Sequence, residues 1–299
     1  MELKFRKSKG LTLIELLLAL AISGILMAAI YRTFIGQHKT YSVQEQVVDM
    51  QQNARGAISR MMREIRMAGF GNVSSVLPNF TANGGPFNNI INSSDNKNIV
   101  DGQMTDQVTI IGAFEQVSTL ASEATPGTST IQLAGKASEF DPANRKYICI
   151  GGLETHTISY VDTVGNTITL NENVVNRFPI DTPVPVFKVK AITYRLRPDN
   201  LNPNMPVLTR EDRTDGGGSQ VVAENIDNLQ FRYVMEDGSE SDSPADPSRI
   251  RMVRVTVRAR TSFRDLGFKS DPEFKVDEGG FRRRTIVSNI MVRNMMSNP

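Results

Sequence analysis

The chain begins with a basic tip and then an apolar run over residues 11–30, in which Glu15 is the single charged residue. About 20 helical residues at 1.5 Å per residue cross the ~30 Å hydrocarbon core of a bilayer, so this run predicts one transmembrane helix. The basic residues before it predict that the N-terminus stays in the cytoplasm.

Glu15 needs an explanation, because a carboxylate inside a membrane costs roughly 2.5–3.5 kcal/mol on insertion scales. One interpretation is that its side chain reaches the interface. The other starts from Gly10, which precedes the apolar run, whereas the small residue of a secretory cleavage site follows it. Cleavage between Gly10 and Leu11 would leave the helix on the mature chain and give Leu11 a free amine. Glu15 of a neighbouring helix, stacked with an axial offset, would then neutralise that amine.

The sequence "KGLTLIELLLALAI" over residues 9–22 resembles the type III signal of type IV prepilins and pseudopilins. The matching features are the basic leader, Gly10 at −1, an apolar residue at +1, Thr at +2 and Glu15 at +5. The resemblance implies that a membrane aspartic prepilin peptidase cuts between Gly10 and Leu11 and N-methylates Leu11. It also implies that Glu15 is the assembly carboxylate. The commoner methylated residue in such proteins is Phe, and this chain has Leu there.

Apolar positions continue at helical spacing beyond the membrane run, and they predict an amphipathic second half of the same helix. The spacing is three or four residues at Val43, Val47, Met50, Ala54, Ala57, Met61, Ile65 and Ala68. Gly69 and Gly71 then predict the helix end. The arginines beside the stripe are expected on a solvated face, with pairs at helical spacing such as Arg60 with Glu64.

Residues 72–106 are rich in Asn, Ser and Gly without periodicity and are expected to form a long surface loop. Beyond them, short β-branched runs predict strands, with a hairpin around residues 165–166. The sequence "RIRMVRVTVRART" alternates, which predicts a strand with one buried and one wet face. The alternating positions are Val253, Val255, Val257 and Ala259 on one face, and Met252, Arg254, Thr256, Arg258 and Arg260 on the other. Residues 282–296 predict a closing strand, although a terminal helix fits them nearly as well.

These elements predict an α+β fold in which the amphipathic half of the helix packs on an antiparallel sheet. The expected parts are a cleaved leader over 1–10, a long helix over 11–69 with its transmembrane half at 11–31, a loop and β-rich insertion over 70–190, and a C-terminal sheet over 191–299. The sequence "SRMMREIRMAGFGN" and the closing strands resemble PilW-like minor pilins. Pseudopilin J of type II secretion has a similar organisation. The resemblance implies a type IV pilin-like fold.

Composition adds few constraints. The chain has 299 residues and a net charge of +2, and the ten N-terminal residues carry four bases and one acid. The remaining 30 bases and 31 acids leave a nearly neutral body, so no nucleic-acid partner is predicted. The single cysteine, Cys149, forms no intrachain disulfide and is expected to be a buried small hydrophobe.

A search for catalytic chemistry finds no constellation. Neither His38 nor His156 has metal-ligand spacing, and "DGGGSQ" lacks the strand–helix context of a phosphate loop. The acidic stretch over residues 235–248 could bind Ca²⁺, but a solvated connection between strands is favoured, because the spacing does not fit an EF-hand. The arginines at 282–284 are expected on a solvated edge strand rather than against an acidic partner or DNA. We therefore expect neither an enzyme nor a cofactor.

The resemblance implies a minor pilin in the bacterial inner membrane that later joins an extracellular pilus. Its expected partners are prepilin peptidase, other minor and major pilins, and membrane lipid before assembly. The implied roles are pilus priming, adhesion, twitching motility or DNA uptake. A type II secretion pseudopilin is the alternative within the class, and a membrane-anchored enzyme or sensor is the alternative outside it.

Overall fold

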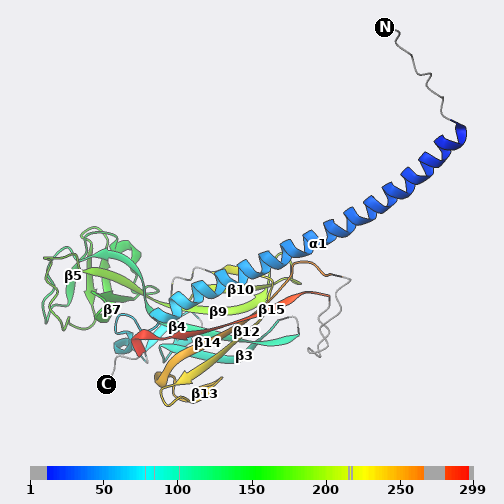
Figure 1. The fold of residues 1–299 in the computed structure, drawn as a ribbon. Helices are drawn as coiled ribbons and strands as arrows, with labels where there is room; N and C mark the ends of the chain where they lie inside the picture. The colour runs from blue at the N-terminus through cyan, green and yellow to red at the C-terminus, as the bar shows by residue number, and fades with distance from the viewer. Residues whose placement is uncertain are drawn as a thin grey trace, which may run out of the picture. The chain divides into compact units, whose positions relative to one another are not determined.

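The computed structural model describes residues 12–77, 79–83, 85–100, 102–214, 216, 218–265 and 280–295. It contains one long helix followed by a β-rich region (Figure 1). The chain divides into two compact units, Met1–Asp49 and Met50–Pro299. Among the described residues, every strand belongs to the second unit.

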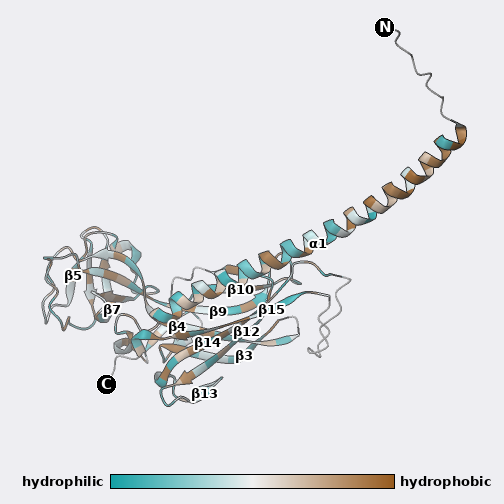
Figure 2. Cartoon of the chain, viewed as in Figure 1, coloured by the Kyte–Doolittle hydropathy of each residue, from teal (hydrophilic) through white to brown (hydrophobic). Residues whose placement is uncertain are grey.

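Helix α1 spans Leu13–Met67 and changes character along its length. All its side chains over residues 13–41 are exposed, and those of the first turns are strongly apolar (Figure 2). The second half buries one stripe, as its periodicity predicts. The buried residues of α1 are Met50, Ala54, Ala57, Ile58, Met61 and Ile65. The helix ends before Gly69, which has a φ of +80° and whose N–H donates to the Ile111 carbonyl at 2.8 Å.

The strands form two antiparallel sheets and a small hairpin. Their bounds are β1 Phe80–Ala82, β2 Gly85–Phe87, β3 Ile91–Val100, β4 Gln103–Thr119, β5 Thr130–Gln132, β6 Tyr147–Ile150, β7 Glu154–Asp162, β8 Thr167–Leu170, β9 Pro185–Pro198, β10 Pro206–Asp212, β11 Ser219–Glu224, β12 Ile226–Met235, β13 Glu240–Ser241, β14 Ile250–Arg260 and β15 Arg283–Met291. The short 3₁₀ helices are η1 Val73–Val76, η2 Ala137–Glu139, η3 Pro247–Arg249 and η4 Arg293–Met295.

The larger sheet is organised around the long strand β9. Residues 185–195 of β9 pair with β4, whose other edge carries β3. On its opposite edge, β9 pairs with β6 near Lys188 and with β10 from Ile192 onward. Strands β6, β7, β8 and β5 continue into a separate lobe (Figure 1). This lobe has an apolar core of its own that runs from Val117 to Val186 and includes Ile131, Phe140, Ile168 and Phe178.

The smaller sheet has the order β13-β12-β14-β15. Its β14 strand alternates as predicted, with Val253, Val255 and Val257 fully buried. Arg260 was expected on the wet face, and that expectation is wrong, because the side chain is only 4% exposed. The guanidinium donates to the Asn204 carbonyl and lies 4.3 Å from the centre of the Phe281 ring, which compensates its burial.

Asp106 joins the two sheets. This residue of β4 is 2% exposed, and its Oδ2 accepts the Phe231 N–H of β12 at 2.7 Å. Its Oδ1 accepts the N–H of Asn96 in the irregular part of β3 at 3.0 Å. Burial raises the pKa of Asp106, and the nearby Asp95 carboxyl adds to that rise. One carboxyl group thus fixes backbone from two other strands.

Glu64 fixes the second half of α1 on the larger sheet. Its carboxylate accepts the Tyr194 hydroxyl of β9 at 2.6 Å and the Nε–H of Arg210 from β10 at 2.9 Å. Burial, followed by the nearby carboxylate, raises the pKa of Tyr194, so the phenol stays protonated and donates. The predicted pair of Glu64 with Arg60 is therefore wrong, because sheet residues compete successfully for the carboxylate.

The expectation of a surface loop over residues 72–106 is also wrong. This stretch forms η1, the β1–β2 hairpin, strand β3 and the start of β4. The sequence does not predict strand β3, because its side chains are mostly polar and only its end residues Ile91 and Val100 are buried. Its pairing with β4 supplies the order that the side-chain pattern does not reveal. Strands β10 and β11, which flank turns in the sequence, were likewise not anticipated.

Cys149 is buried beside the helix end, as the sequence predicts. Gly71 approaches it with a φ of +92°, and a Cβ on Gly71 would lie 2.7 Å from the Cys149 Sγ and 2.9 Å from the Ala113 Cβ. Glycine is therefore required here by both backbone conformation and space. Burial raises the pKa of the Cys149 thiol from its usual value of 9.0 to about 11.

We predict that Arg210→Ala lowers the free energy of unfolding by about 2–3 kcal/mol, because the largely buried Glu64 carboxylate loses a charged hydrogen-bond partner. Tyr194→Phe should cost about 1 kcal/mol. Urea unfolding of the chain in detergent, followed by circular dichroism, measures both. The control is Arg63→Ala on the exposed side of the same helix, expected to stay within about 0.5 kcal/mol. Equal losses for Arg210→Ala and the control would contradict this role of Glu64.

The Cys149 thiol should be inert in the folded chain at pH 8, because it is inaccessible and protonated. Iodoacetamide labelling followed by mass spectrometry should find it unmodified, whereas the same reaction in guanidinium should go to completion. Because the folded state raises this pKa, the thiol's contribution to stability is present below pH 9 and decreases as the pH rises from about 9 to about 11. Rapid labelling of the folded chain would show that the site is open.

Candidate functional site

Glu15 lies in the first turn of α1 and forms a reciprocal cap with Thr12. The Thr12 N–H and the Thr12 hydroxyl both donate to the Glu15 Oε2 at 2.9 Å. In return, the Glu15 N–H donates to the Thr12 Oγ1 at 3.3 Å. This is the capping-box arrangement, in which a Thr before the helix and a Glu three residues later satisfy free backbone donors of the first turn. The carboxylate that the sequence singles out is therefore already hydrogen-bonded within its own chain.

Sequence reasoning found Glu15 but missed the structural role of Thr12. The signal was present, since Thr-x-x-Glu immediately before an apolar run is the sequence signature of a capping box. Gly10 and Leu11 lie outside the described residues. Cleavage between them and methylation of Leu11 therefore stay predictions.

The environment of Glu15 is an apolar helix surface without cover. Leu13, Ile14, Leu16 and Leu17 are all more than half exposed. Helix α1 is long and apolar enough to cross a membrane, and none of its most apolar 18-residue window is buried. A surface of this size is not stable in water, so it requires lipid or other apolar helices. The N-terminal apolar helix thus indicates a membrane anchor, as in prepilins.

The acidic stretch over residues 235–248 is neutralised by arginines. Glu236 pairs with Arg249 and Arg251, each at 2.7 Å. Further pairs join Arg232 to Asp242 at 2.9 Å, Arg254 to Glu240 at 2.9 Å and Arg249 to Asp237 at 3.4 Å. Within the part of the chain that the structure describes, no cluster of three or more His, Cys, Asp or Glu could hold a metal ion. This stretch is a paired connection between β12 and β14.

The two histidines have different surroundings. His156 is buried, and its Nε2 lies 2.8 Å from the Glu154 Oε2. The same carboxylate accepts the N–H groups of Val175 and Asn176, so it fixes the loop that follows β8. These backbone bonds, opposing the effect of burial, lower the pKa of Glu154. His38 is exposed on α1, with its ring 6.3 Å from that of Phe34.

The arginines at 282–284 are not a uniform solvated edge. Arg283 binds the Oδ2 of Asp227 at 2.6 Å, and Arg282 binds the Oδ2 of Asp265 at 2.9 Å. Asp227 is 2% exposed and also accepts Arg258 at 3.1 Å. Arg284 is exposed. Two of the three arginines therefore serve ion pairs within the fold.

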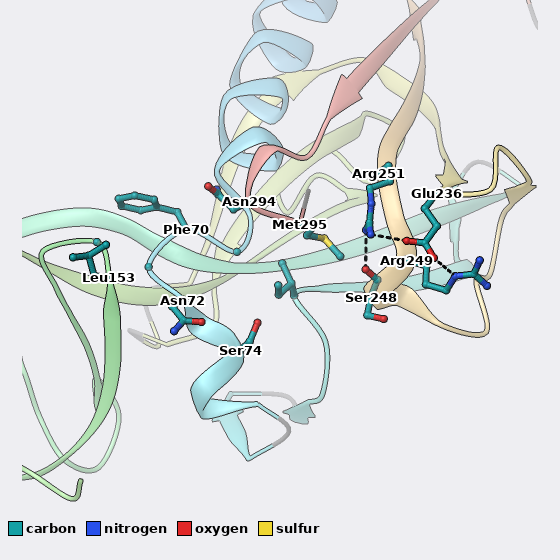
Figure 3. Close-up of a pocket in the computed structure, with 14 residues that line it drawn as sticks. Phe70, Asn72, Ser74, Leu153, Glu236, Ser248, Arg249, Arg251, Asn294 and Met295 are labelled. Carbon is teal, nitrogen blue, oxygen red and sulfur yellow. Dashed lines mark hydrogen bonds and ion pairs between the residues drawn. The ribbon is translucent and has the colours of Figure 1, made fainter. Parts of the chain in front are cut away.

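A cleft of about 670 Å³ lies near the end of α1 (Figure 3). Phe70, Asn72 and Leu153 line one side of it, and Glu236 with Arg251 lies on another. Its described lining contains neither histidine nor cysteine, and Glu236 is held between arginines. Ser248 on its lining donates its hydroxyl to the Asp246 Oδ1 at 2.6 Å, a contact within the short turn before β14.

The family model for the prokaryotic N-terminal methylation motif matches residues 5–31. A search of curated proteins and a search of solved structures return no match. The motif contains the expected cleavage site together with Thr12 and Glu15, and it extends to the end of the apolar run. It indicates a type IV pilin-like or pseudopilin-like protein that prepilin peptidase processes and that assembles with other pilins.

Proposed function

We propose that the chain is a minor pilin of a type IV pilus, a structural subunit without catalytic activity or cofactor. Prepilin peptidase would remove residues 1–10 and methylate Leu11 in the inner membrane, with the N-terminus on the cytoplasmic side. The mature chain would then enter the priming or tip complex of the pilus. There it would support assembly, adhesion, twitching motility or DNA uptake.

The main observation behind the proposal is that the Glu15 carboxylate is capped by Thr12 on a helix whose apolar side chains are exposed. Glu15 follows Leu11 by four residues in the sequence, and cleavage after Gly10 would free the amine of Leu11. Burying the apolar run against other pilin helices would remove both the amine and the carboxylate from water. Two opposite charges that pair tolerate such burial, whereas either charge alone is strongly disfavoured. Glu15 would therefore specify the axial register of neighbouring subunits.

The proposal favours a pilus over a secretion system on the resemblance of residues 59–72 to PilW-like minor pilins. The methylation motif is shared by pilins and pseudopilins, so it does not separate the two. A type II secretion pseudopilin would use the same N-terminal mechanism. The β-rich region, including the lobe with its own core, would be the pilin-like head displayed on the filament.

We predict that the protein from its native host has an intact mass that lacks residues 1–10 and includes one additional methyl group. Processing by prepilin peptidase produces this mass, because the enzyme both cleaves and methylates. The leader-containing precursor should accumulate when the peptidase gene is deleted. A full-length mass in the wild-type host would refute the pilin assignment and favour a plain membrane anchor.

Two variants separate the charge of Glu15 from its cap. Glu15→Gln retains an acceptor at the capping position but removes the charge, so we expect normal cleavage and loss from sheared pili. Thr12→Ala removes the cap, at a cost of about 1 kcal/mol to the helix, but retains the charge, so it should still assemble. The measurement is the ratio of chain in sheared pili to chain in the membrane. Glu224→Ala, at an exposed glutamate of β11, is the matched control. Normal assembly of Glu15→Gln would exclude an assembly role for the charge.

A further inference from the structure

Lys190 is a buried lysine whose amine lies between two carboxylates. Its Nζ is 2.7 Å from the Asp212 Oδ2 and 2.6 Å from the Glu115 Oε2. Three strands of the larger sheet supply these groups, with the lysine on β9, the aspartate at the end of β10 and the glutamate on β4. The pairing of β4 with β9 is irregular between Gly112 and Glu115, and such an irregularity changes the direction of the side chains that follow it.

The two oxygens of the Asp212 carboxylate have different partners. Oδ2 faces the Lys190 amine, whereas Oδ1 accepts the Thr214 N–H at 3.1 Å and the Thr214 hydroxyl at 2.5 Å. Thr214 is buried, so both donors are held in place. Fixed donors on one oxygen stabilise the negative charge that it gains when a nucleophile adds to the carbon beside it. The carboxyl group of Asp212 therefore has a nucleophile's nitrogen at one oxygen and charge-stabilising donors at the other.

We propose that Lys190 and Asp212 join in an amide bond that forms within the folded chain and links β9 covalently to β10. This inference goes beyond the pilin function and does not depend on it. One proton of the Lys190 ammonium first passes to the Asp212 Oδ2, which leaves a neutral amine beside a carboxylic acid. The lone pair of Nζ then adds to the Asp212 Cγ, and Oδ1 carries the negative charge. Glu115 takes a second proton from Nζ and returns it to Oδ2, which leaves as water while the amide forms.

The reaction starts from an ion pair, and proximity offsets the cost of neutralising it. Burial alone would lower the pKa of Lys190, but hydrogen bonds with Asp212 and Glu115 raise it above its usual value. Burial alone would raise the pKa of Asp212, but its bonds to Lys190 and Thr214 lower it. The first proton transfer is therefore uphill. Groups held in contact by a rigid framework nevertheless react as if at effective concentrations of about 10⁵–10⁸ M, far above those of free reactants.

Asp212 is assigned as the acceptor and Glu115 as the proton carrier because their surroundings differ. The Asp212 side chain is only 11% exposed, whereas that of Glu115 is 49% exposed. The buried carboxyl is the one that Thr214 holds by its second oxygen, and water has less access to it. The half-exposed Glu115 can move between the amine and the departing oxygen, as a proton carrier must.

The bond would close a loop that holds the end of α1 in place. The segment between Lys190 and Asp212 contains Tyr194 and Arg210, which both bind the Glu64 carboxylate. A covalent link between the ends of this segment restricts the unfolded chain and prevents β9 and β10 from separating. The larger sheet would then retain the partners of Glu64 even when the helix is pulled away from it.

Peptide mapping of the full-length chain, purified in detergent, tests for the bond. Digestion followed by tandem mass spectrometry should give a branched peptide that joins the segments around Lys190 and Asp212. Its mass should be one water molecule below the sum of the two separate peptides. Lys188 contacts Glu139 at 2.7 Å on the same strand and is the internal control, expected only in unlinked peptides. A folded chain with Lys190 unlinked would show an ion pair only and overturn the proposal, as would a branch from Lys190 to Glu115.

Three variants separate the reaction from the ion pair, with circular dichroism as the check that each is folded. Lys190→Arg retains the positive charge and should contain no branched peptide. Glu115→Gln removes the proton carrier and should lower the linked fraction at least about tenfold, because positioned proton transfer typically contributes 10²-fold or more. Asp212→Asn would release ammonia in place of water, so its linked form should have the same mass as the linked wild-type chain. An unchanged linked fraction in folded Glu115→Gln would overturn the assigned reaction.

Discussion

The exposed apolar surface on the first half of α1 is the main physical constraint on this protein, because it requires an apolar environment. Its apolar side chains from Leu13 onward are exposed on all sides, and no described part of the chain covers them. Such a surface leaves water only by entering lipid or by packing against similar helices. Membrane anchoring and assembly with other pilins are the two solutions, and the methylation motif over residues 5–31 indicates a protein that uses both.

The β-rich unit has to be stable without help from that surface, and buried carboxyl groups contribute to its stability. Glu64 holds the end of α1 on β9 and β10, while Asp106 holds β12 against β4. Each group bonds residues more than 120 positions away in sequence. Such bonds confer specificity, because an apolar contact tolerates sliding and a carboxylate with two fixed donors does not.

The sequence predicted those elements whose side-chain burial follows a regular pattern within the element itself. The apolar run, the helical stripe from Met50, the glycine stop and the alternation of β14 all follow from the environment of each residue's own element. The sequence did not predict β3, because its polar residues are ordered by pairing with β4 rather than by burial. The partners of Glu64 and the ion pairs of Asp227 were also beyond reach, since they depend on which distant strands become neighbours. At the candidate site, the sequence predicts the carboxylate and contains the signature of its cap, but the bond that is predicted to be cut lies outside the described residues.

In the proposed assembly, the cap on Glu15 would stabilise the charged carboxylate in the apolar helix before it pairs with another subunit. An unpaired carboxylate in the membrane is costly, and two hydrogen bonds from Thr12 reduce that cost without neutralising the charge. The cap stabilises the helix by only about 1 kcal/mol, which is too little to prevent Glu15 from forming a buried ion pair with an amine. Thr12 therefore holds the carboxylate at the first turn of α1 and leaves its charge available for the proposed pairing. A stronger partner within the chain, such as an arginine one turn later, would neutralise Glu15 and leave no charge for the proposed pairing with a neighbouring subunit.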